Sequence, residues 1–123
     1  MIMSKHLIIF THGNLGQSLL DTVSLIIPFD FEIKVISNRG LDLKGSVKLL
    51  ESAIREGDNF LFTDFPGGSC FMASKLLSKS RTIFTVSGVN ISMIVSFITK
   101  YKTNSSEELL EIIKNDGKRA IDY

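Results

Sequence analysis

Short apolar runs recur along the chain, and the segments between them carry apolar residues every three or four positions. Four runs predict β-strands: HLIIF from His6, FEIKVIS from Phe31, NFLFT from Asn59 and RTIFTVS from Arg81. The first and third runs are almost continuously apolar, which is typical of central strands in a parallel sheet that is covered on both faces.

The segments between the runs predict helices. The first helix carries an apolar stripe that Pro28 ends, formed by Leu15, Leu19, Val23, Ile26 and Ile27. The second has Glu51 and Arg55 one turn apart outside its stripe and stops near Gly57. Its stripe consists of Val47, Leu50 and Ile54.

Three further helices are predicted, over about residues 69–78, over about residues 91–101, and from Ser105 onward. Ser105 and Glu108 have the spacing of a capping box at the start of the last helix. The apolar residues of that helix are Leu109, Leu110, Ile112 and Ile113.

Strands and helices that alternate with short links predict right-handed crossovers and a parallel sheet with helices on both faces. Residues 1–123 contain no internal repeat, low-complexity segment or domain linker. We therefore expect an α/β fold, with one doubly wound domain built on a mostly parallel four-stranded sheet.

Ligands of doubly wound folds bind beyond the carboxyl ends of the strands, where the strand order reverses. The segments that follow the predicted strands are residues 11–13, 38–40, 64–69 and 88–90. We expect the chemistry of this chain to come from these segments.

Charge is nearly balanced, with 14 Lys and Arg against 13 Asp and Glu and a formal net charge of +1. No field of one sign is present to attract nucleic acid or an anionic membrane, so we expect neither as a partner. The single cysteine, Cys70, can form neither an internal disulfide nor a metal cluster of its own, which suits a reducing cytoplasm.

The N-terminal apolar run stops at Thr11 and lacks a small-residue cleavage site, so we expect no signal peptide. No apolar run approaches the roughly 20 residues that span a bilayer. We therefore expect a soluble, cytoplasmic protein.

His12 stands where the first predicted strand passes into a helix, and Gly13 allows the backbone to turn tightly there. An imidazole can act as a base, a metal ligand or a nucleophile, because its neutral form is well populated near neutral pH. Taken alone, such a histidine is as often structural as functional. Its position at the expected edge of the site favours a function.

Asp64 occupies the equivalent position after the third strand, so adjacent strands would bring its carboxylate toward His12. A carboxylate that accepts a hydrogen bond from one ring nitrogen fixes the tautomer and leaves the other nitrogen free to attack. The alternative is that Asp64 only caps the turn before Pro66. Together, the two residues favour an activated histidine.

The sequence PGGS, from Pro66 to Ser69, leads into the third helix. Exposed backbone N–H groups at a glycine-rich helix start form an anion site. The segment lacks the spacing and the lysine of a P-loop, and an ordinary glycine turn with Ser69 as N-cap is an equally good interpretation of it in isolation. Beside a nucleophile, it predicts a phosphate-sized cradle.

Three segments, IIFTHGNLGQSLL, FLFTDFPGGSCFMAS and VSGVNISMIV, occur in the order and spacing of a known family. They resemble the mannose-family enzyme IIA of the bacterial phosphoenolpyruvate-dependent sugar phosphotransferase system. The similarity extends from about Ile8 to Tyr101. It implies a doubly wound sheet of order 2-1-3-4 and a homodimer, with no metal and no organic cofactor.

The resemblance also implies roles for single residues. His12 would accept a phosphoryl group at Nε2 from the phosphocarrier protein HPr and pass it to a IIB component, while Asp64 pairs with the other ring nitrogen. The implied phosphate pocket consists of Thr11, Gly67, Gly68, Ser69 and Asn90.

The chain departs from the family pattern after the glycines. The family commonly continues GGSPFN, whereas this chain reads GGSCFM, with Cys70 in place of proline and Met72 in place of asparagine. Losing the proline loosens the helix start, and losing the amide removes a possible hydrogen bond. The departures leave His12 and Asp64 intact but put the usual partner surface, and with it sugar transport, in question.

Three functions remain open from the sequence. The leading hypothesis is a phosphocarrier for sugar uptake or for a regulatory target. The second is a domain like the phosphotransfer subunit of dihydroxyacetone kinase. The third is a non-catalytic flavodoxin-like module that binds an anion or a protein.

Overall fold

The computed structural model describes residues 4–123, and residues 1–3 lie outside the described part. Four strands form one parallel sheet in the order β2-β1-β3-β4. They are β1 Lys5–His12, β2 Lys34–Asn38, β3 Asp58–Thr63 and β4 Ile83–Val86. The helices of residues 4–123 are α1 Leu15–Ile26, α2 Leu43–Ala53, α3 Ser69–Leu77, α4 Ile91–Lys100 and α5 Ser106–Arg119. The predicted α/β fold and strand order are confirmed.

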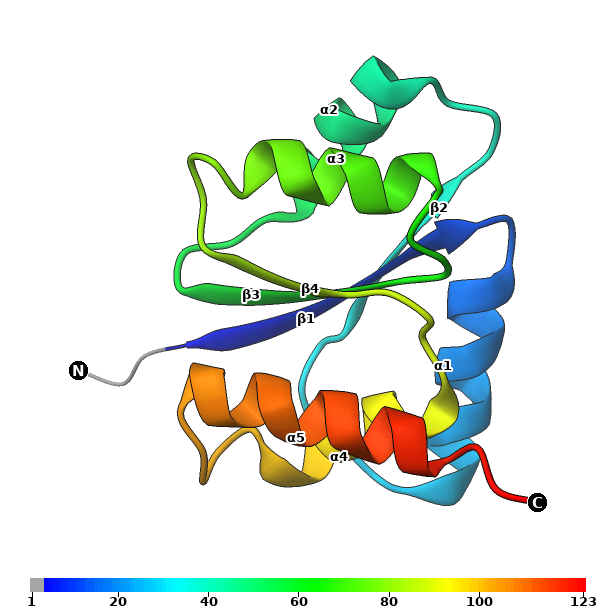
Figure 1. The fold of residues 1–123 in the computed structure, drawn as a ribbon, viewed down its shortest axis with the longest axis vertical. Coiled ribbons are helices and arrows are strands. Elements are labelled where there is room, and N and C mark those ends of the chain that lie inside the picture. The colour runs from blue at the N-terminus through cyan, green and yellow to red at the C-terminus, as the bar shows by residue number, and fades with distance from the viewer. Residues whose placement is uncertain (1–3) are drawn as a thin grey trace.

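Two helical layers cover the sheet, with α2 and α3 on one face and α1, α4 and α5 on the other (Figure 1). Successive residues of β1 enter opposite layers: Ile9 belongs to the apolar cluster under α4 and α5, and Phe10 belongs to the cluster under α2 and α3. Both side chains are fully buried. This arrangement explains the continuous apolar run, because a strand covered on both faces has no polar side.

The second strand is shorter than predicted, because β2 begins at Lys34 and the predicted run began at Phe31. The Phe31 ring instead packs against Tyr101, with ring centroids 4.8 Å apart, and against Phe97 of α4. Because this ring packs against aromatic side chains, the segment around Phe31 does not join the sheet. Pairing of β2 with β1 starts at Lys34. The fourth strand is likewise confined to Ile83–Val86.

Helix α2 ends at Ala53, so the predicted pairing of Glu51 with Arg55 along one helix is wrong. Arg55 lies beyond the helix and forms an ion pair with Glu32. The stripe predicted for α1 is only partly buried, because Val23 is fully buried whereas Ile26 is 59% exposed. Leu15, at the start of that stripe, is also exposed.

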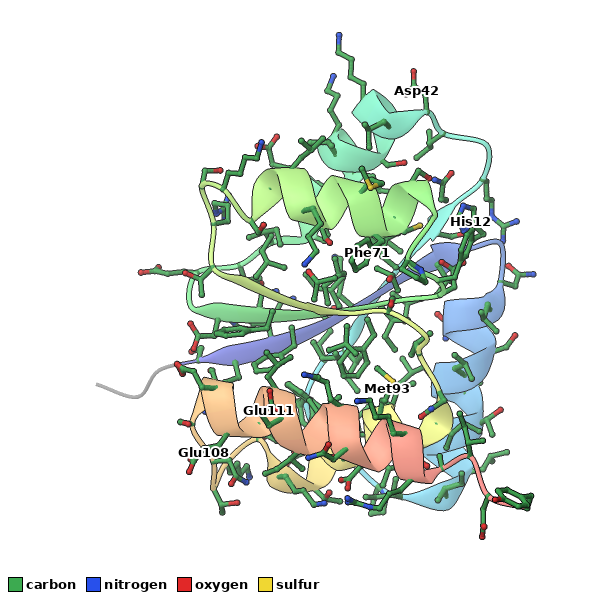
Figure 2. All side chains as sticks on the ribbon, viewed as in Figure 1. His12, Asp42, Phe71, Met93, Glu108 and Glu111 are labelled. Carbon is green, nitrogen blue, oxygen red and sulfur yellow. The ribbon has the colours of Figure 1, made fainter. Side chains whose placement is uncertain are left out.

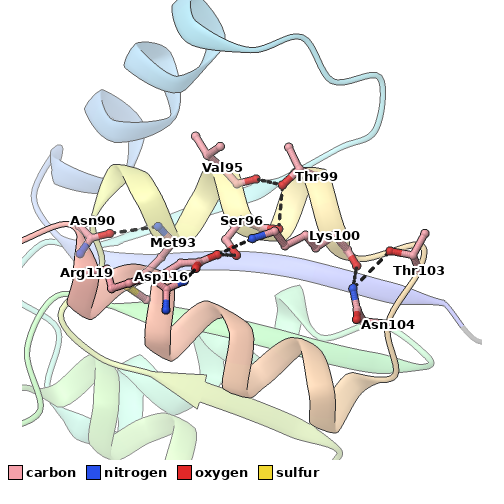
Figure 3. Close-up of polar contacts among 10 residues, drawn as sticks. All are labelled: Asn90, Met93, Val95, Ser96, Thr99, Lys100, Thr103, Asn104, Asp116 and Arg119. Atoms are coloured by element: carbon pink, nitrogen blue, oxygen red, sulfur yellow. Dashed lines mark hydrogen bonds and ion pairs between the residues drawn. The ribbon is translucent and has the colours of Figure 1, made fainter.

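Helices α4 and α5 are joined by a polar cluster around Asp116 (Figure 3). The Asp116 carboxylate accepts hydrogen bonds from Ser96 and from Lys100, both at 2.7 Å, and pairs with Arg119. At the other end of α5, Ser105 and Glu108 form the predicted capping box. The Asp116 contacts hold α4 and α5 together on the sheet face that also carries α1.

Candidate active site

His12 is the last residue of β1, so the strand continues through Thr11 and does not break there as the hydrophobic pattern predicted. In the sheet, His12 is paired with Asn38 of β2. Gly13 has a φ of +57° and turns the chain toward α1. Figure 2 shows His12 at the carboxyl end of β1, where α3 begins.

Asp64 approaches His12 because β3 runs parallel to β1 and pairs Thr63 with Phe10. Asp64 Oδ2 lies 2.7 Å from His12 Nδ1 and accepts the backbone N–H of His12 at 3.0 Å. Its other oxygen, Oδ1, accepts the backbone N–H of Phe65 at 3.0 Å. These backbone hydrogen bonds thus fix the Asp64 carboxylate at the ends of β1 and β3, where it faces the Nδ1 edge of the imidazole.

Asp64 is ionised, because its pKa lies below the ordinary value for aspartate. Burial raises this pKa, but hydrogen bonds from the His12 backbone, the His12 ring and the Phe65 backbone together outweigh burial. An ionised carboxylate can only accept hydrogen bonds, so His12 Nδ1 carries the proton. The lone pair of neutral His12 is therefore on Nε2.

The start of α3 lies against the same ring. A Cβ atom at Gly68 would be 3.0 Å from His12 Cε1, the carbon between the two ring nitrogens. Gly68 is the N-cap of α3 and provides no side-chain hydrogen bond to the first turn. The first N–H groups of α3 therefore remain available to an anion beside the imidazole.

The implied pocket residues do not all gather at this point. Gly67 and Gly68 lie beside the Phe65 ring, and the hydroxyl of Ser69 accepts a hydrogen bond from Asn38 at 2.6 Å. Thr11 is fully buried, and its hydroxyl accepts the backbone N–H of Gly16 at 2.8 Å.

Asn90 caps a different helix. Its side-chain oxygen accepts the backbone N–H of Met93 at 3.0 Å, and its amide donates to the Gly117 carbonyl at 3.1 Å. Within residues 4–123, no hydrogen bond joins Asn90 to His12 or Asp64. The side-chain oxygen of Asn90 thus caps α4, and its amide joins the start of α4 to α5.

Two residues from the segments that follow β2 and β3 also shape the site, although the sequence assigned neither of them a role. Asn38, paired with His12 in the sheet, is 3% exposed and donates to Ser69 of α3 and Ser46 of α2. Phe65 is 51% exposed, with its ring centroid 5.8 Å from that of His12. Asn38 was visible as a polar residue after an apolar run, whereas nothing in the sequence signalled the position of the Phe65 ring.

Cys70 is a third residue that contributes to the site although the sequence did not single it out as a candidate. It is fully buried in the layer under α2 and α3. Its thiol also joins His12 and Asp64 in a group whose potential ligand atoms all lie within 4.8 Å of one another. Burial, and then the charge of Asp64, raise the pKa of the thiol to about 12.

In the comparison with protein families, the EIIA-man family, described as the PTS system fructose IIA component, matches residues 6–114. Comparison with curated proteins finds no match. Among residues 4–123, no helix has the length and apolar character needed to cross a membrane.

Solved structures share the fold. Phosphotransferase system component EIIA from Streptococcus agalactiae has a TM-score of 0.90 and 21% identity, over 98% of this chain and 97% of that one. The mannose/sorbose specific IIA subunit from Enterococcus faecalis has a TM-score of 0.89 and 18% identity, over 98% of this chain and 95% of that one. The similarity spans both proteins almost from end to end.

Proposed function

Because the chain belongs to the EIIA-man family of phosphotransferase-system IIA components, we propose that it is a phosphocarrier that works through His12. It accepts a phosphoryl group from phospho-HPr and passes it to a IIB component for sugar uptake, or to a regulatory target. Asp64 and the segment from Gly67 to Ser69 assist both steps.

One observation carries the proposal: Asp64 accepts a hydrogen bond from Nδ1 of His12, which leaves Nε2 free to act as the nucleophile. The His12 side chain is 44% exposed, so a donor protein can reach it. The uncapped start of α3 lies beside the same ring. A nucleophile, an orienting carboxylate and N–H donors for an anion are the groups that phosphoryl transfer requires from a protein.

In the transfer step, the lone pair of Nε2 attacks phosphorus, and the bond between phosphorus and the donor breaks as the Nε2–P bond forms. Nδ1 keeps its proton, and the ionised Asp64 balances the positive charge that develops on the ring. The N–H groups at the start of α3 stabilise the oxygens of the phosphoryl group. The reverse sequence delivers the group to the acceptor.

The direct test is labelling from radioactive phosphoenolpyruvate with enzyme I and cognate HPr. The wild-type chain should become labelled, and His12→Ala should not, while His6→Ala provides the matched histidine control from the same strand. If the wild type stays unlabelled with active HPr, or if His12→Ala is labelled equally, the carrier function is wrong. A non-catalytic binding module would give the first result.

The acceptor and the assembly belong to the same proposal. Adding a purified IIB component to the labelled chain should transfer the label and return His12 to its free form. We expect the chain to act as a cytoplasmic homodimer, which sedimentation velocity tests through a molar mass twice that of the single chain. A monomer would remove the dimer from the proposal and leave the transfer chemistry in place.

A further inference from the structure

Three different donor atoms converge beside His12. A ring nitrogen of His12, a carboxylate oxygen of Asp64 and the Cys70 sulfur lie within 4.8 Å of one another. Nitrogen, oxygen and thiolate sulfur are the ligands that Zn²⁺ takes in proteins, and the thiolate selects against hard cations such as Mg²⁺. The sulfur comes from Cys70, the single cysteine of the chain.

The donors come from three elements that the sheet holds together. His12 ends β1, Asp64 follows β3, and Cys70 is the second residue of α3. Their exposure falls in order, from 44% for the His12 side chain to 13% for Asp64 and zero for Cys70. The imidazole thus lies on the solvent-exposed side of the group and the thiol on its buried side.

Only small movements separate this group from a tetrahedral site. Metal–ligand distances of about 2.0 to 2.3 Å place neighbouring ligand atoms about 3.5 Å apart. The most distant pair must therefore approach by roughly 1 Å, and the 2.7 Å contact between His12 and Asp64 must open. Rotation of the half-exposed imidazole opens that contact, and water would complete the coordination.

Charge favours an ion at this position. A carboxylate and a thiolate are both anionic when they bind a metal, and a coordinating thiol gives up its proton to the solvent. One Zn²⁺ then balances the two anionic ligands.

We propose that His12, Asp64 and Cys70 form a binding site for Zn²⁺ or a similar thiophilic divalent cation, and that the bound ion keeps His12 from being phosphorylated. The second clause rests on the phosphocarrier function proposed above. An ion on Nε2 occupies the attacking nitrogen. An ion on Nδ1 displaces the bond to Asp64 and leaves the ring proton on Nε2, which then has no lone pair for the attack. Metal binding and phosphorylation therefore exclude each other.

Titration of the chelator-treated chain with Co²⁺ tests the site without any partner protein. The wild type should give a near-ultraviolet thiolate-to-cobalt charge-transfer band that saturates at one ion per chain and disappears when Zn²⁺ is added. Cys70→Ser should lose the band. His12→Ala should weaken Co²⁺ binding by more than about 100-fold, which exceeds the loss expected for a residue that only supports a metal ligand. His6→Ala, with its ring bonded to the Glu56 carbonyl, should bind as the wild type does.

The proposal is overturned if the wild type gives no band, or if His12→Ala and Asp64→Asn both keep its affinity within about twofold. Replacement of the buried Cys70 can prevent folding, and circular dichroism tests for this. His12→Ala removes an exposed ring, so the His12 variant still tests the proposal in that case. Addition of Zn²⁺ should lower His12 labelling at least about tenfold in the wild type, and less than about twofold in Cys70→Ser.

The two proposals fail separately. A chain that binds Co²⁺ but takes no label overturns the phosphocarrier function and leaves the metal site standing. A chain that takes label but binds no Co²⁺ overturns the metal site alone.

Discussion

Asp64 holds His12 at two points, because its Oδ2 atom accepts both the backbone N–H, at 3.0 Å, and the ring Nδ1–H, at 2.7 Å. The first bond places the carboxylate on the strand end, and the second orients the imidazole. The His12 ring therefore has a fixed tautomer although its side chain is 44% exposed.

Asp64→Asn should slow His12 labelling by about 100- to 10,000-fold, because an amide can donate to Nδ1 and so favour the wrong tautomer. Single-turnover labelling by phospho-HPr measures this rate. Asp21→Asn is the control, since Asp21 is an exposed carboxylate on α1 that accepts from Gln17. Equal slowing in both variants would contradict the orienting role of Asp64.

Gly68→Ala should impair labelling more than Gly67→Ala. A Cβ atom at Gly68 would lie 3.0 Å from His12 Cε1 and 3.1 Å from the Phe65 ring, whereas one at Gly67 would lie 3.3 Å from the Phe65 ring. Only the first substitution pushes the imidazole, so we expect about a tenfold difference in rate from the misplaced ring. Equal rates for the two variants would show that contact of Gly68 with the ring is unimportant.

Asp116→Asn should lower the free energy of unfolding by about 1 to 2 kcal/mol at neutral pH, because Ser96 and Lys100 lose a charged acceptor. Urea unfolding measures this change. Glu111→Gln is the control on the same helix, since Glu111 pairs only at the surface and should change stability by less than about 0.5 kcal/mol.

The same carboxylate gives a pH dependence. Hydrogen bonds from Lys100 and then Ser96, aided by the charges of Lys100 and Arg119, hold the pKa of Asp116 below its ordinary value. Its contribution to stability is complete above the unfolded-state pKa and is lost as the pH falls through the lower folded-state pKa. In acid, wild type and Asp116→Asn should therefore converge in stability, and a constant difference down to that pH would contradict this assignment.

Gly16→Ala should destabilise the fold by about 1 to 3 kcal/mol through overpacking. A Cβ atom there would lie 2.9 Å from Ile9 Cγ2 and 3.2 Å from Thr11 Oγ1, where α1 crosses β1. Thermal and urea unfolding measure the loss, with Ser18→Ala on the exposed face of α1 as the control. A neutral result would mean that α1 shifts away from the sheet at no cost.

Much of the site was predictable because its two main side chains follow buried apolar runs. In a parallel sheet, residues at the ends of neighbouring strands meet at one edge, and this rule alone brings Asp64 toward His12. The glycines before α3 follow from the same rule. Strand order and helix placement likewise follow from alternating periodicities.

The remaining features depend on tertiary contacts that leave no periodic signal. A lone cysteine gives no ligand spacing, so the approach of Cys70 to His12 and Asp64 was invisible in the sequence. Phe31 extended an apolar run, but its ring packs on Tyr101 and shortens the strand. The hydroxyl of Thr11 accepts a hydrogen bond from the backbone of Gly16 at the start of α1, a contact that only the three-dimensional packing reveals.

The half-open position of the imidazole has a kinetic consequence. Under the proposed phosphocarrier function, a phosphoryl group on His12 would be exchanged without the opening of a lid, so we expect the transfer rate to rise in proportion to partner concentration up to the limit of encounter. Flux through such a carrier follows the supply of charged donors and empty acceptors in the surrounding solution. We then expect the phosphorylated fraction of His12 to follow the phosphorylation state of its partners with little delay.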